Sequence, residues 1–168
     1  IFKAVFLAGG PGSGKSFVAG KTALQALGFK LINSDDAFEA GLKKAGLSTS
    51  PEDIASAQGQ KIRAGAKAIT GRKMQLALDG RLGLVIDGTG KDYGKIKKQV
   101  DDLRKLGYAV KMIFVNTDLD TSIMRNDKRP RSLPQQLVVK LWKEVQKNIG
   151  KFQGLFRNRM IIIDNSEG

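Results

Sequence analysis

The stretch GGPGSGKS at residues 9–16 decides the fold of this chain, and it directly follows the apolar run AVFLA at residues 4–8. It meets every fixed position of the pattern G-x-x-x-x-G-K-[ST], with an expected strand before it and an expected helix after it, as the pattern requires. A glycine-rich turn formed by chance does not account for a full match in this context. The stretch therefore predicts a loop that holds the phosphates of a nucleotide.

The residues of this loop have separate expected tasks. Gly12, Ser13 and Gly14 are expected to direct backbone N–H groups toward the phosphates, where the N-terminus of the following helix adds positive potential. Lys15 should reach the β- and γ-phosphates, and the hydroxyl of Ser16 should ligate Mg²⁺. The sequence thus predicts that the chain binds ATP and Mg²⁺, but the loop alone does not say where the last phosphate goes.

Short apolar runs alternate with longer amphipathic stretches along the chain. The expected strands cover residues 4–8, 29–33, 82–87, 108–115 and 159–164. The expected helices run from the glycine-rich loop to about residue 27 and over residues 35–45, 51–77, 92–106, 118–126 and 134–149. This order predicts an α/β fold, in which a single domain over residues 1–168 forms a three-layer αβα sandwich. Its central sheet should have five mainly parallel strands that are buried on both faces.

The expected helix over residues 51–77 has an apolar and a basic side. Ile62, Ala66, Ile69 and Leu76 recur at helical spacing and are expected to form its buried face. The basic residues in and just after this stretch are Lys61, Arg63, Lys67, Arg72, Lys73 and Arg81. Two interpretations of them stay open: a solvated helix face, or one wall of a nucleic-acid groove.

Composition restricts the chemistry that is possible. The chain has 168 residues, enough for one good hydrophobic core, and it contains neither cysteine nor histidine. This excludes a disulfide framework, a thiolate metal site, a cysteine nucleophile and the usual histidine general base. Any acid–base step must therefore fall to Asp, Glu, Lys or Tyr.

The net charge of +13 points to the partner, because 29 Lys and Arg face only 16 Asp and Glu. A field of this sign attracts polyanions, so nucleic acid is the first candidate partner, with DNA favoured. No apolar run is long enough to span a bilayer, and no signal-peptide pattern is visible. We therefore expect a cytoplasmic location (the host cytoplasm if a phage encodes the chain), no membrane and no obligate protein partner.

Two kinds of reaction compete for a phosphate-loop protein: attack by water, as in a GTPase, and attack by a substrate hydroxyl, as in a kinase. The segment DGTG at residues 87–90 fits the D-x-x-G pattern of GTPase switches. Guanine selection in those proteins uses N-K-x-D, however, and the segment NTDL at residues 116–119 lacks the lysine. The GTPase interpretation therefore ranks second.

The kinase interpretation rests first on LINSDD, which ends an expected strand with the two carboxylates Asp35 and Asp36. In a doubly wound sheet this strand end lies beside the phosphate loop. With no histidine in the chain, an aspartate aimed at the γ-phosphate is the natural group to orient a hydroxyl and take its proton. The competing interpretation is that Ser34 or Asp35 caps the next helix, and we expect one of the two carboxylates to do so.

The kinase interpretation rests second on the segment RNDKRPR at residues 125–131. Arg125 and Arg129 are four residues apart and could share one helix face, with Lys128 and Arg131 nearby. Guanidinium groups suit a transferring phosphoryl group because they stay charged and donate in a planar fork. A lid that carries them could close over the nucleotide and exclude water.

These motifs together resemble a known family. PGSGKS, GFKLINSDD, LVIDGTG and MRNDKR occur in the order and spacing of the zeta-toxin and polynucleotide-kinase group of phosphate-loop kinases, including the kinase domain of bacteriophage polynucleotide kinase. The resemblance covers most of the chain, and its INxDD and RNxxR elements are more selective than the phosphate loop. It implies a phosphate-loop kinase fold with an arginine-bearing lid and transfer of a phosphoryl group to an alcohol.

The resemblance also implies a role for each matching residue. Lys15 and Ser16 would bind phosphates and Mg²⁺, and Asp35 would be the general base. Arg125 and Arg129 would be lid arginines that contact the nucleotide and take part in catalysis. On the acceptor side, the implied substrate residues are Asp36, Asp87 and Thr89, with Asp87 also implied near Mg²⁺.

One position departs from the family. Polynucleotide kinase has a basic residue on the helix after the Asp pair that helps to hold the acceptor, and here Phe38 stands in that place. A phenyl ring cannot pair with a phosphate, but it can stack on a base, so Phe38 is expected to be a substrate residue. The resemblance thus leaves open a polynucleotide 5′-hydroxyl or the hydroxymethyl group of a modified base, because some related phage kinases phosphorylate 5-hydroxymethyluracil within DNA.

The sequence therefore predicts a phosphotransferase that moves the γ-phosphate of ATP to a hydroxyl on nucleic acid. Three alternatives stay open at this point. The first is a kinase of a small molecule such as a nucleotide or nucleotide sugar, and the second is an NTPase without transfer. The third is a nucleotide-dependent DNA-binding module that is not an enzyme.

Overall fold

The computed structural model describes residues 1–21, 24–129 and 132–167, and its secondary structure alternates strands and helices. The strands are β1 (Phe2–Ala8), β2 (Lys30–Ile32), β3 (Leu84–Asp87), β4 (Tyr108–Asn116) and β5 (Met160–Asp164). The helices are α1 (Lys15–Lys21), α2 (Ser34–Lys44), α3 (Pro51–Ala55), α4 (Ala57–Asp79), α5 (Tyr93–Lys105), α6 (Leu119–Asp127) and α7 (Gln135–Phe156), and a short 3₁₀ turn, η1 (Arg157–Arg159), follows α7.

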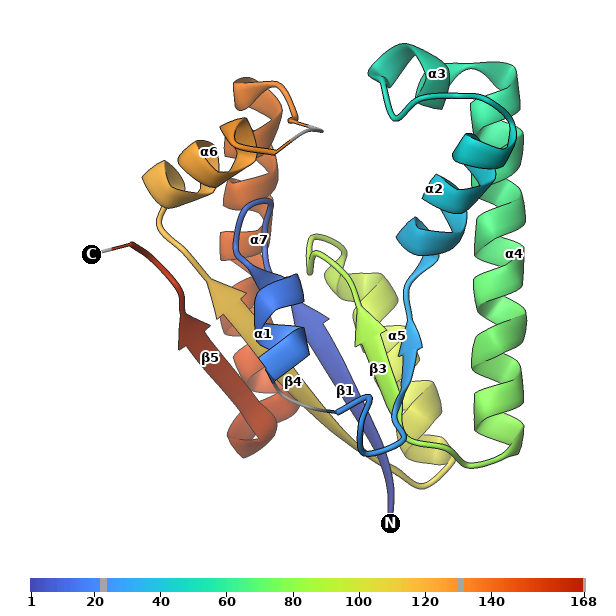
Figure 1. Ribbon diagram of the computed structural model, residues 1–168. Coiled ribbons are helices and arrows are strands. Elements are labelled where there is room, and N and C mark those ends of the chain that lie inside the picture. Colours follow the sequence, from blue (N-terminus) through green and yellow to red (C-terminus); the bar gives the residue numbers. More distant parts are fainter. Residues whose placement is uncertain (22–23, 130–131, 168) are drawn as a thin grey trace.

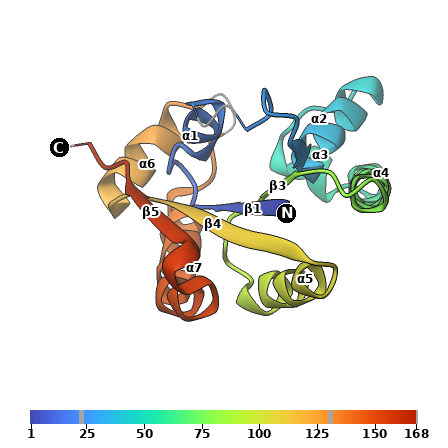
Figure 2. The same ribbon diagram turned by 90° about the horizontal axis from the view of Figure 1, so that it is seen from below.

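The five strands form one parallel sheet in the order β2-β3-β1-β4-β5. Helices α5 and α7 cover one face of this sheet, while α1 lies on the other, and α4 runs beyond the β2 edge (Figures 1 and 2). The prediction of an α/β sandwich with a central five-stranded sheet is therefore confirmed, and the sheet is entirely parallel. All strands end at the same edge, where ligands bind in folds of this class.

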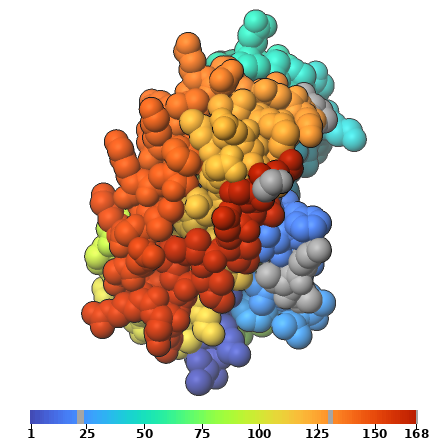
Figure 3. All heavy atoms as spheres, turned by 90° about the vertical axis from the view of Figure 1, so that its left-hand side faces the viewer, coloured from blue at the N-terminus to red at the C-terminus, as the bar shows by residue number. Residues whose placement is uncertain are grey.

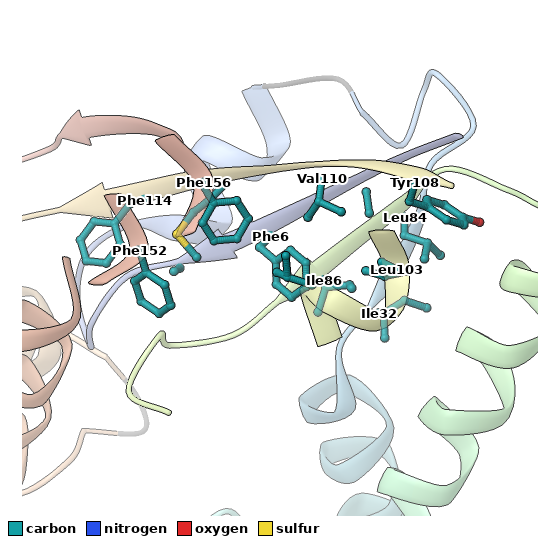
Figure 4. Close-up of a cluster of buried hydrophobic side chains, with 14 of the residues drawn as sticks. Phe6, Ile32, Leu84, Ile86, Leu103, Tyr108, Val110, Phe114, Phe152 and Phe156 are labelled. Carbon is teal, nitrogen blue, oxygen red and sulfur yellow. The ribbon is translucent and has the colours of Figure 1, made fainter. Parts of the chain in front are cut away.

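The main core lies between the sheet and the helices α5 and α7. Phe6 on β1 packs toward Phe156 on α7, with ring centroids 6.0 Å apart. Phe114 on β4 and Phe152 on α7 are fully buried in the same cluster, which Figure 4 shows from the side. Each buried aromatic side chain of this size removes about 150–250 Å² from water. This packing fixes the strand ends that carry the functional loops.

The single helix expected over residues 51–77 is in fact two helices. Ser56 has an extended backbone, with φ −59° and ψ 156°, and it separates α3 from α4. Its hydroxyl accepts a hydrogen bond from the N–H of Gly59 at 3.0 Å and so caps α4. A side chain at Gly59 would meet the carbonyl oxygen of Asp53, so the glycine allows the two helices to pack closely.

The expected buried face of α4 is only partly correct. Ala66 is buried and Ile62 is half-buried, but 60% of Ile69 and 71% of Leu76 are exposed. The spacing of these residues is helical, but the neighbours of α4 are α2 and the β2 edge of the sheet, and they cover a different side of the helix. That side includes the buried Ala77.

Other element boundaries also differ from the expectations. Helix α1 ends at Lys21, and residues 24–28 form turns, so the helix expected to reach residue 27 is shorter. Helix α7 extends to Phe156, seven residues past its expected end at 149. Strand β5 is an edge strand rather than a strand buried on both faces, with Ile161 56% exposed. No helix in the described ranges has the length and apolarity needed to cross a membrane.

Candidate active site

The loop at residues 9–16 connects β1 to α1 at the carboxyl edge of the sheet (Figure 1). Gly12 and Gly14 have φ angles of +72° and +83°, in the left-handed region that favours glycine. A Cβ at Gly12 would lie 2.6 Å from the carbonyl oxygen of Ser122 on α6. The loop therefore has little freedom to change shape, and its conformation requires glycine on both torsional and steric grounds.

Lys15 lies at the start of α1 and connects the loop to the end of β3. Its Nζ is 3.5 Å from Oδ1 of Asp87, and both side chains are largely buried. The second oxygen of Asp87, Oδ2, accepts a hydrogen bond of 3.1 Å from the side-chain amide of Asn33 at the end of β2. Three strand ends thus place a lysine, a carboxylate and an amide in one cluster.

Asn33 also decides what the two carboxylates after it are free to do. Its side-chain oxygen accepts a hydrogen bond of 2.8 Å from the N–H of Asp35 and caps α2. The expectation that Ser34 or one carboxylate of the pair caps this helix is therefore wrong. Asp35 and Asp36 lie exposed in the first turn of α2, where the helix N-terminus favours their negative charge.

The two carboxylates face different hollows. Asp36 lines a hollow of about 280 Å³ together with Ser16, Asn33 and Asp87, on the side of α1. Asp35 lines a hollow of about 170 Å³ that is closed on its other side by α4. The pair thus lies between a side that faces the phosphate loop and a side that faces α4.

Phe38 does not present an open ring for stacking, which differs from the expectation. Only 5% of the residue is exposed, because it packs with Leu42 on α2 and Ala66 on α4 in a small core of its own. The guanidinium carbon of Arg63 lies 4.9 Å from the centre of the ring, within the range of a cation–π contact. Arg63 thus lies beside Asp35, in the same hollow.

Thr89 lies in the loop between β3 and α5, which is fixed from two directions. Its carbonyl accepts a hydrogen bond of 3.1 Å from the N–H of Gly9, which joins this loop to the phosphate loop. The side-chain amide of the buried Asn148 on α7 donates to the carbonyls of Gly90 and Lys91. The exposed Thr89 therefore lies on a rigid loop beside Asp87 and lines a hollow of about 460 Å³ with it.

Helix α6 brings Arg125 to the phosphate loop. Nη1 of Arg125 donates to the carbonyl of Gly12 at 3.4 Å, and its Nε donates to Oε1 of Glu167 at 3.2 Å. Arg129 does not share a helix face with Arg125, because α6 ends at Asp127 and Arg129 is exposed in the following turn. The neighbouring Arg131 lies outside the described residues.

Sequence reasoning missed the part of Asn126 in this segment. The residue is 1% exposed, and its amide bonds both the carbonyl and the N–H of Leu133, at 2.8 and 2.9 Å. It therefore ties the end of α6 to the chain just before α7. The only signal in the sequence is its place in the RNxxR segment, which does not distinguish a structural asparagine from a catalytic one.

The polar residues just before α6 form hydrogen bonds within the fold. Asp118 caps α6, and hydrogen bonds from the N–H and hydroxyl of Thr121 hold the pKa of its carboxyl below the usual value. Oδ1 of Asn116 accepts a hydrogen bond of 2.6 Å from Gln146. The segment at residues 116–119, compared above with the guanine-selecting motif, thus has a structural role.

The C-terminal segment closes the other side of the phosphate loop. Asn165 donates from its side-chain amide to the carbonyl of Ser13 at 2.9 Å, and Glu167 contacts Arg125 as described. Figure 3 shows these last residues, in red, lying beside α6 and close to the blue residues of the N-terminal part. The loop is thus held by side chains from α6 and from the C-terminal segment.

Two buried oxygens without a hydrogen-bond partner in the described ranges indicate what this site can hold. Oγ of Ser13 and Oδ1 of Asp87 are buried without a hydrogen-bond partner among the described residues. Buried polar atoms are normally satisfied, so their position beside Lys15 fits a bound phosphate group and its hydrated cation. In the described part of the chain, no group of three or more acidic side chains could hold a metal alone. A magnesium ion there would need phosphate oxygens as ligands, which is its usual mode in nucleotide enzymes.

Comparison with solved structures supports this fold over almost the whole chain. A structure of AvrRxo1-ORF1:-ORF2 with ATP superposes with a TM-score of 0.71 at 16% identity and covers 96% of this chain and 54% of that one. The PezAT toxin–antitoxin system of Streptococcus pneumoniae gives 0.66 at 16% identity, with 97% and 68% covered. The Pnkp1/Rnl/Hen1 RNA repair complex gives 0.68 at 19% identity, with 89% and 46% covered.

The chain therefore spans only about half the length of the AvrRxo1 protein. All three neighbours belong to systems of more than one protein, which conflicts with the expectation of no obligate protein partner. No curated protein matches the chain. The model of the zeta toxin family matches residues 3–167, which is nearly the full length. The chain thus belongs to the zeta toxin family, and its fold is that of a phosphate-loop kinase.

Proposed function

We propose that this protein transfers the γ-phosphoryl group of ATP to a hydroxyl on nucleic acid. The observation that carries the proposal is the arrangement at Asn33, which caps α2 with its own side chain and leaves Asp35 exposed on the acceptor side. A carboxylate that accepts the proton of an attacking hydroxyl is the group that a kinase requires.

The donor side would hold ATP and Mg²⁺ through residues that already lie together. Backbone N–H groups at Gly12, Ser13 and Gly14, with Lys15, would bind the phosphates, and the hydroxyl of Ser16 would ligate Mg²⁺. Oδ1 of Asp87, which has no hydrogen-bond partner among the described residues, would accept a hydrogen bond from a water molecule bound to the ion. When bound, Mg²⁺ would neutralise charge on the phosphate oxygens.

The transfer step follows from this arrangement. The acceptor oxygen attacks the γ-phosphorus and forms the new O–P bond, while the bond from the γ-phosphorus to the β–γ bridging oxygen breaks. Asp35 takes the proton of the hydroxyl, and ADP leaves. Arg125, and Arg129 when the segment after α6 folds over the site, would act as lid residues that stabilise charge on the transferring group.

The nature of the acceptor rests on charge and on family resemblance. A net charge of +13 favours a polyanion, and the candidates are a 5′-hydroxyl or the hydroxymethyl group of a modified base such as 5-hydroxymethyluracil in DNA. Asp87 and Thr89 would line the acceptor side, and Asp36 would face Ser16 and the ion. Phe38 would act indirectly, as the surface on which Arg63 rests.

A small-molecule acceptor is the second candidate. The hollow that Asp87 and Thr89 line has a volume of about 460 Å³, within the range of ligand pockets that hold a nucleotide or a nucleotide sugar. An NTPase without transfer is the third, since water can take the place of a hydroxyl in any phosphate-loop site.

The experiment follows the labelled γ-phosphate of ATP in the presence of DNA, RNA, free nucleosides, nucleotide sugars or water alone. We expect label on the polymer in a magnesium-dependent reaction that the Asp35→Asn variant does not support. Label found only as inorganic phosphate would exclude a kinase. Label on small molecules but on no polymer would exclude nucleic acid as the acceptor and favour the second candidate.

A further inference from the structure

Three adjoining hollows form a continuous path past the candidate active site. The first, of about 170 Å³, lies between α2 and α4, and the second, of about 460 Å³, lies between α4 and the β3–α5 loop. The third, of about 650 Å³, lies between the start of α5 and α7. Ser34 and Lys67 line both the first and the second, while Lys91 and Asp92 line both the second and the third.

Six basic residues line this path, and we call them the cationic track: Arg63, Lys67, Lys91, Lys95, Lys140 and Lys151. They come from α4, from the β3–α5 loop and α5, and from α7, which lie in this order across the molecule in Figure 2. Segments far apart in the sequence thus place six cations along one path, which the carboxylates of Asp35, Asp87, Asp92 and Glu144 also line.

The residues of the cationic track are not held in ion pairs. Within the described residues, none of the six forms an ion pair, and the same holds for most other exposed Lys and Arg of these ranges. Lys97 and Lys98, which pair with Asp101 and Asp102, do not line any of the three hollows. The charged groups of the track are therefore available to an anionic ligand.

The two ends of the track are positioned by aromatic rings. Arg63 lies 4.9 Å from the ring centre of Phe38, and Lys151 lies 5.6 Å from that of Tyr93. Contacts of this kind limit the freedom of a long side chain without neutralising its charge. Both ends of the track are thus ordered and still charged.

The track extends to both sides of the reacting groups. Arg63 lies in the hollow of Asp35, whereas Lys140 and Lys151 lie in the third hollow, beyond the loop that carries Thr89. A strand that ended at the active site would need phosphate contacts on one side only. Contacts on both sides suit a strand that continues past the site in both directions.

We infer that the cationic track binds one nucleic-acid strand across the active site, so that the acceptor hydroxyl belongs to an internal nucleotide and not to a strand end. The inference rests on the proposed function and names its acceptor more closely. The second hollow, which has Met74 and Ile96 among its lining residues, would receive the base or sugar that carries the hydroxyl. The hydroxyl would lie at the junction of the first and second hollows, which Ser34 and Lys67 both line, next to Asp35. Arg63 on one side and the third hollow on the other would contact the flanking phosphates.

Of the four carboxylates that line the path, Asp92 and Glu144 lie in the third hollow, away from the reacting groups. Oδ1 of Asp92 accepts a hydrogen bond of 3.0 Å from the N–H of Lys95 and caps α5, so its charge stabilises the N-terminus of this helix. Glu144 on α7 lies in the third hollow with Lys140 and Lys151 and forms no ion pair within the described residues. A strand that follows the third hollow would be repelled by Glu144, so its removal should tighten binding.

The first test compares acceptors with and without ends. The wild-type protein would be given labelled ATP and circular single-stranded DNA with 5-hydroxymethyldeoxyuridine, the same DNA made linear, unmodified linear DNA and circular RNA. We expect at least one circle to be labelled as efficiently as its linear form. Label at the 5′ end of linear strands and on no circle would overturn the inference while upholding the proposed function. Label on no polymer would reject both.

The second test measures the binding of a fluorescent single strand at several salt concentrations. Lys140→Glu/Lys151→Glu should weaken binding at least about tenfold, and the loss of two phosphate contacts should lower the slope against the logarithm of salt by about 1.4. Glu144→Gln should tighten binding about twofold. The matched control is Lys61→Glu/Arg72→Glu, which changes the net charge equally on the opposite side of α4. Equal weakening by both double variants would overturn the track.

Discussion

The donor and acceptor halves of the site are built in opposite ways. On the donor side, the phosphate loop is fixed by glycine conformations, by the close approach of Ser122 and by side chains from α6 and the C-terminal segment. On the acceptor side, Asp35 and Thr89 are exposed, and the cations of the track have no ionic partner among the described residues. The donor ligand is thus expected to meet a preformed site, while the acceptor must supply the missing counter-charges.

Substitutions in the two halves are therefore expected to have different effects. The donor half contains backbone positions at which any side chain collides, so its variants should lose nucleotide binding or stability. The acceptor half contains exposed side chains whose removal costs the fold little, so its variants should change the reaction and leave the fold intact. The predictions below test that division.

The largest expected effect is on Asp35. The Asp35→Asn variant should lower the rate of transfer by about 10²–10⁴, because it removes the group that takes the proton, while ATP affinity stays within about twofold. Single-turnover transfer and equilibrium ATP binding measure the two quantities. Asp36→Asn is the matched control, since Asp36 faces Ser16, and it should chiefly raise the magnesium concentration needed. If Asp36→Asn proved the more damaging variant, the roles of the pair would be reversed.

The next effect concerns Arg125, which joins α6 to the phosphate loop. Arg125→Ala should lower kcat by about 10²-fold, since in the proposed mechanism its guanidinium stabilises charge on the transferring group. Arg125→Lys should recover only part of the lost kcat, because an ammonium group cannot donate in a planar fork. Steady-state kinetics in ATP would check this. If only the KM for ATP changed, Arg125 would serve to bind ATP and would not stabilise the transferring group.

A smaller effect is expected at Arg63, in the acceptor half. Arg63→Ala should raise the KM for the nucleic acid about fivefold to tenfold without changing the KM for ATP. Phe38→Leu keeps the small core of α2 and α4 apolar but removes the ring under the guanidinium, so it should act in the same direction by about twofold to fivefold. Equal changes in both KM values would contradict the division between the halves.

The smallest effect is a stability difference within α4. Gly65 is exposed and a Cβ there would meet nothing within 4 Å, so Gly65→Ala should raise the free energy of unfolding by up to about 1 kcal/mol. Gly59→Ala should lower it by about 1–3 kcal/mol, because the Cβ would press on the carbonyl of Asp53 at the α3–α4 junction. Urea denaturation of both variants gives the two values. If Gly59→Ala also raised the free energy of unfolding, the α3–α4 junction would be able to move apart without loss of stability, contrary to this prediction.

The donor half could be predicted from the sequence because its chemistry is local. Eight consecutive residues specify the loop, and the alternation of apolar and amphipathic stretches specifies the parallel sheet beneath it. The strand end at Asp35 and the segment at Arg125 could be recognised for the same reason, since each is a short motif at a strand or helix end.

The acceptor half could not be predicted because it depends on packing between distant segments. Phe38 is buried only because α4 packs against α2, and nothing near Phe38 in the sequence indicates this. Ile69 and Leu76 are exposed because α2 and the β2 edge of the sheet pack on another side of α4. Lys140 is 45 residues or more from the other cations of the track except Lys151, and only the sheet order brings it near them.

The central claim is that a nucleic-acid hydroxyl receives the phosphoryl group. Its most direct test is nuclease digestion of polymer labelled from γ-labelled ATP, followed by identification of the phosphorylated nucleoside and of the atom that carries the phosphate. We expect label on a hydroxyl of an internal nucleotide with the wild-type protein and no label with the Asp35→Asn variant. Label recovered solely as inorganic phosphate or on a free nucleotide sugar would contradict it.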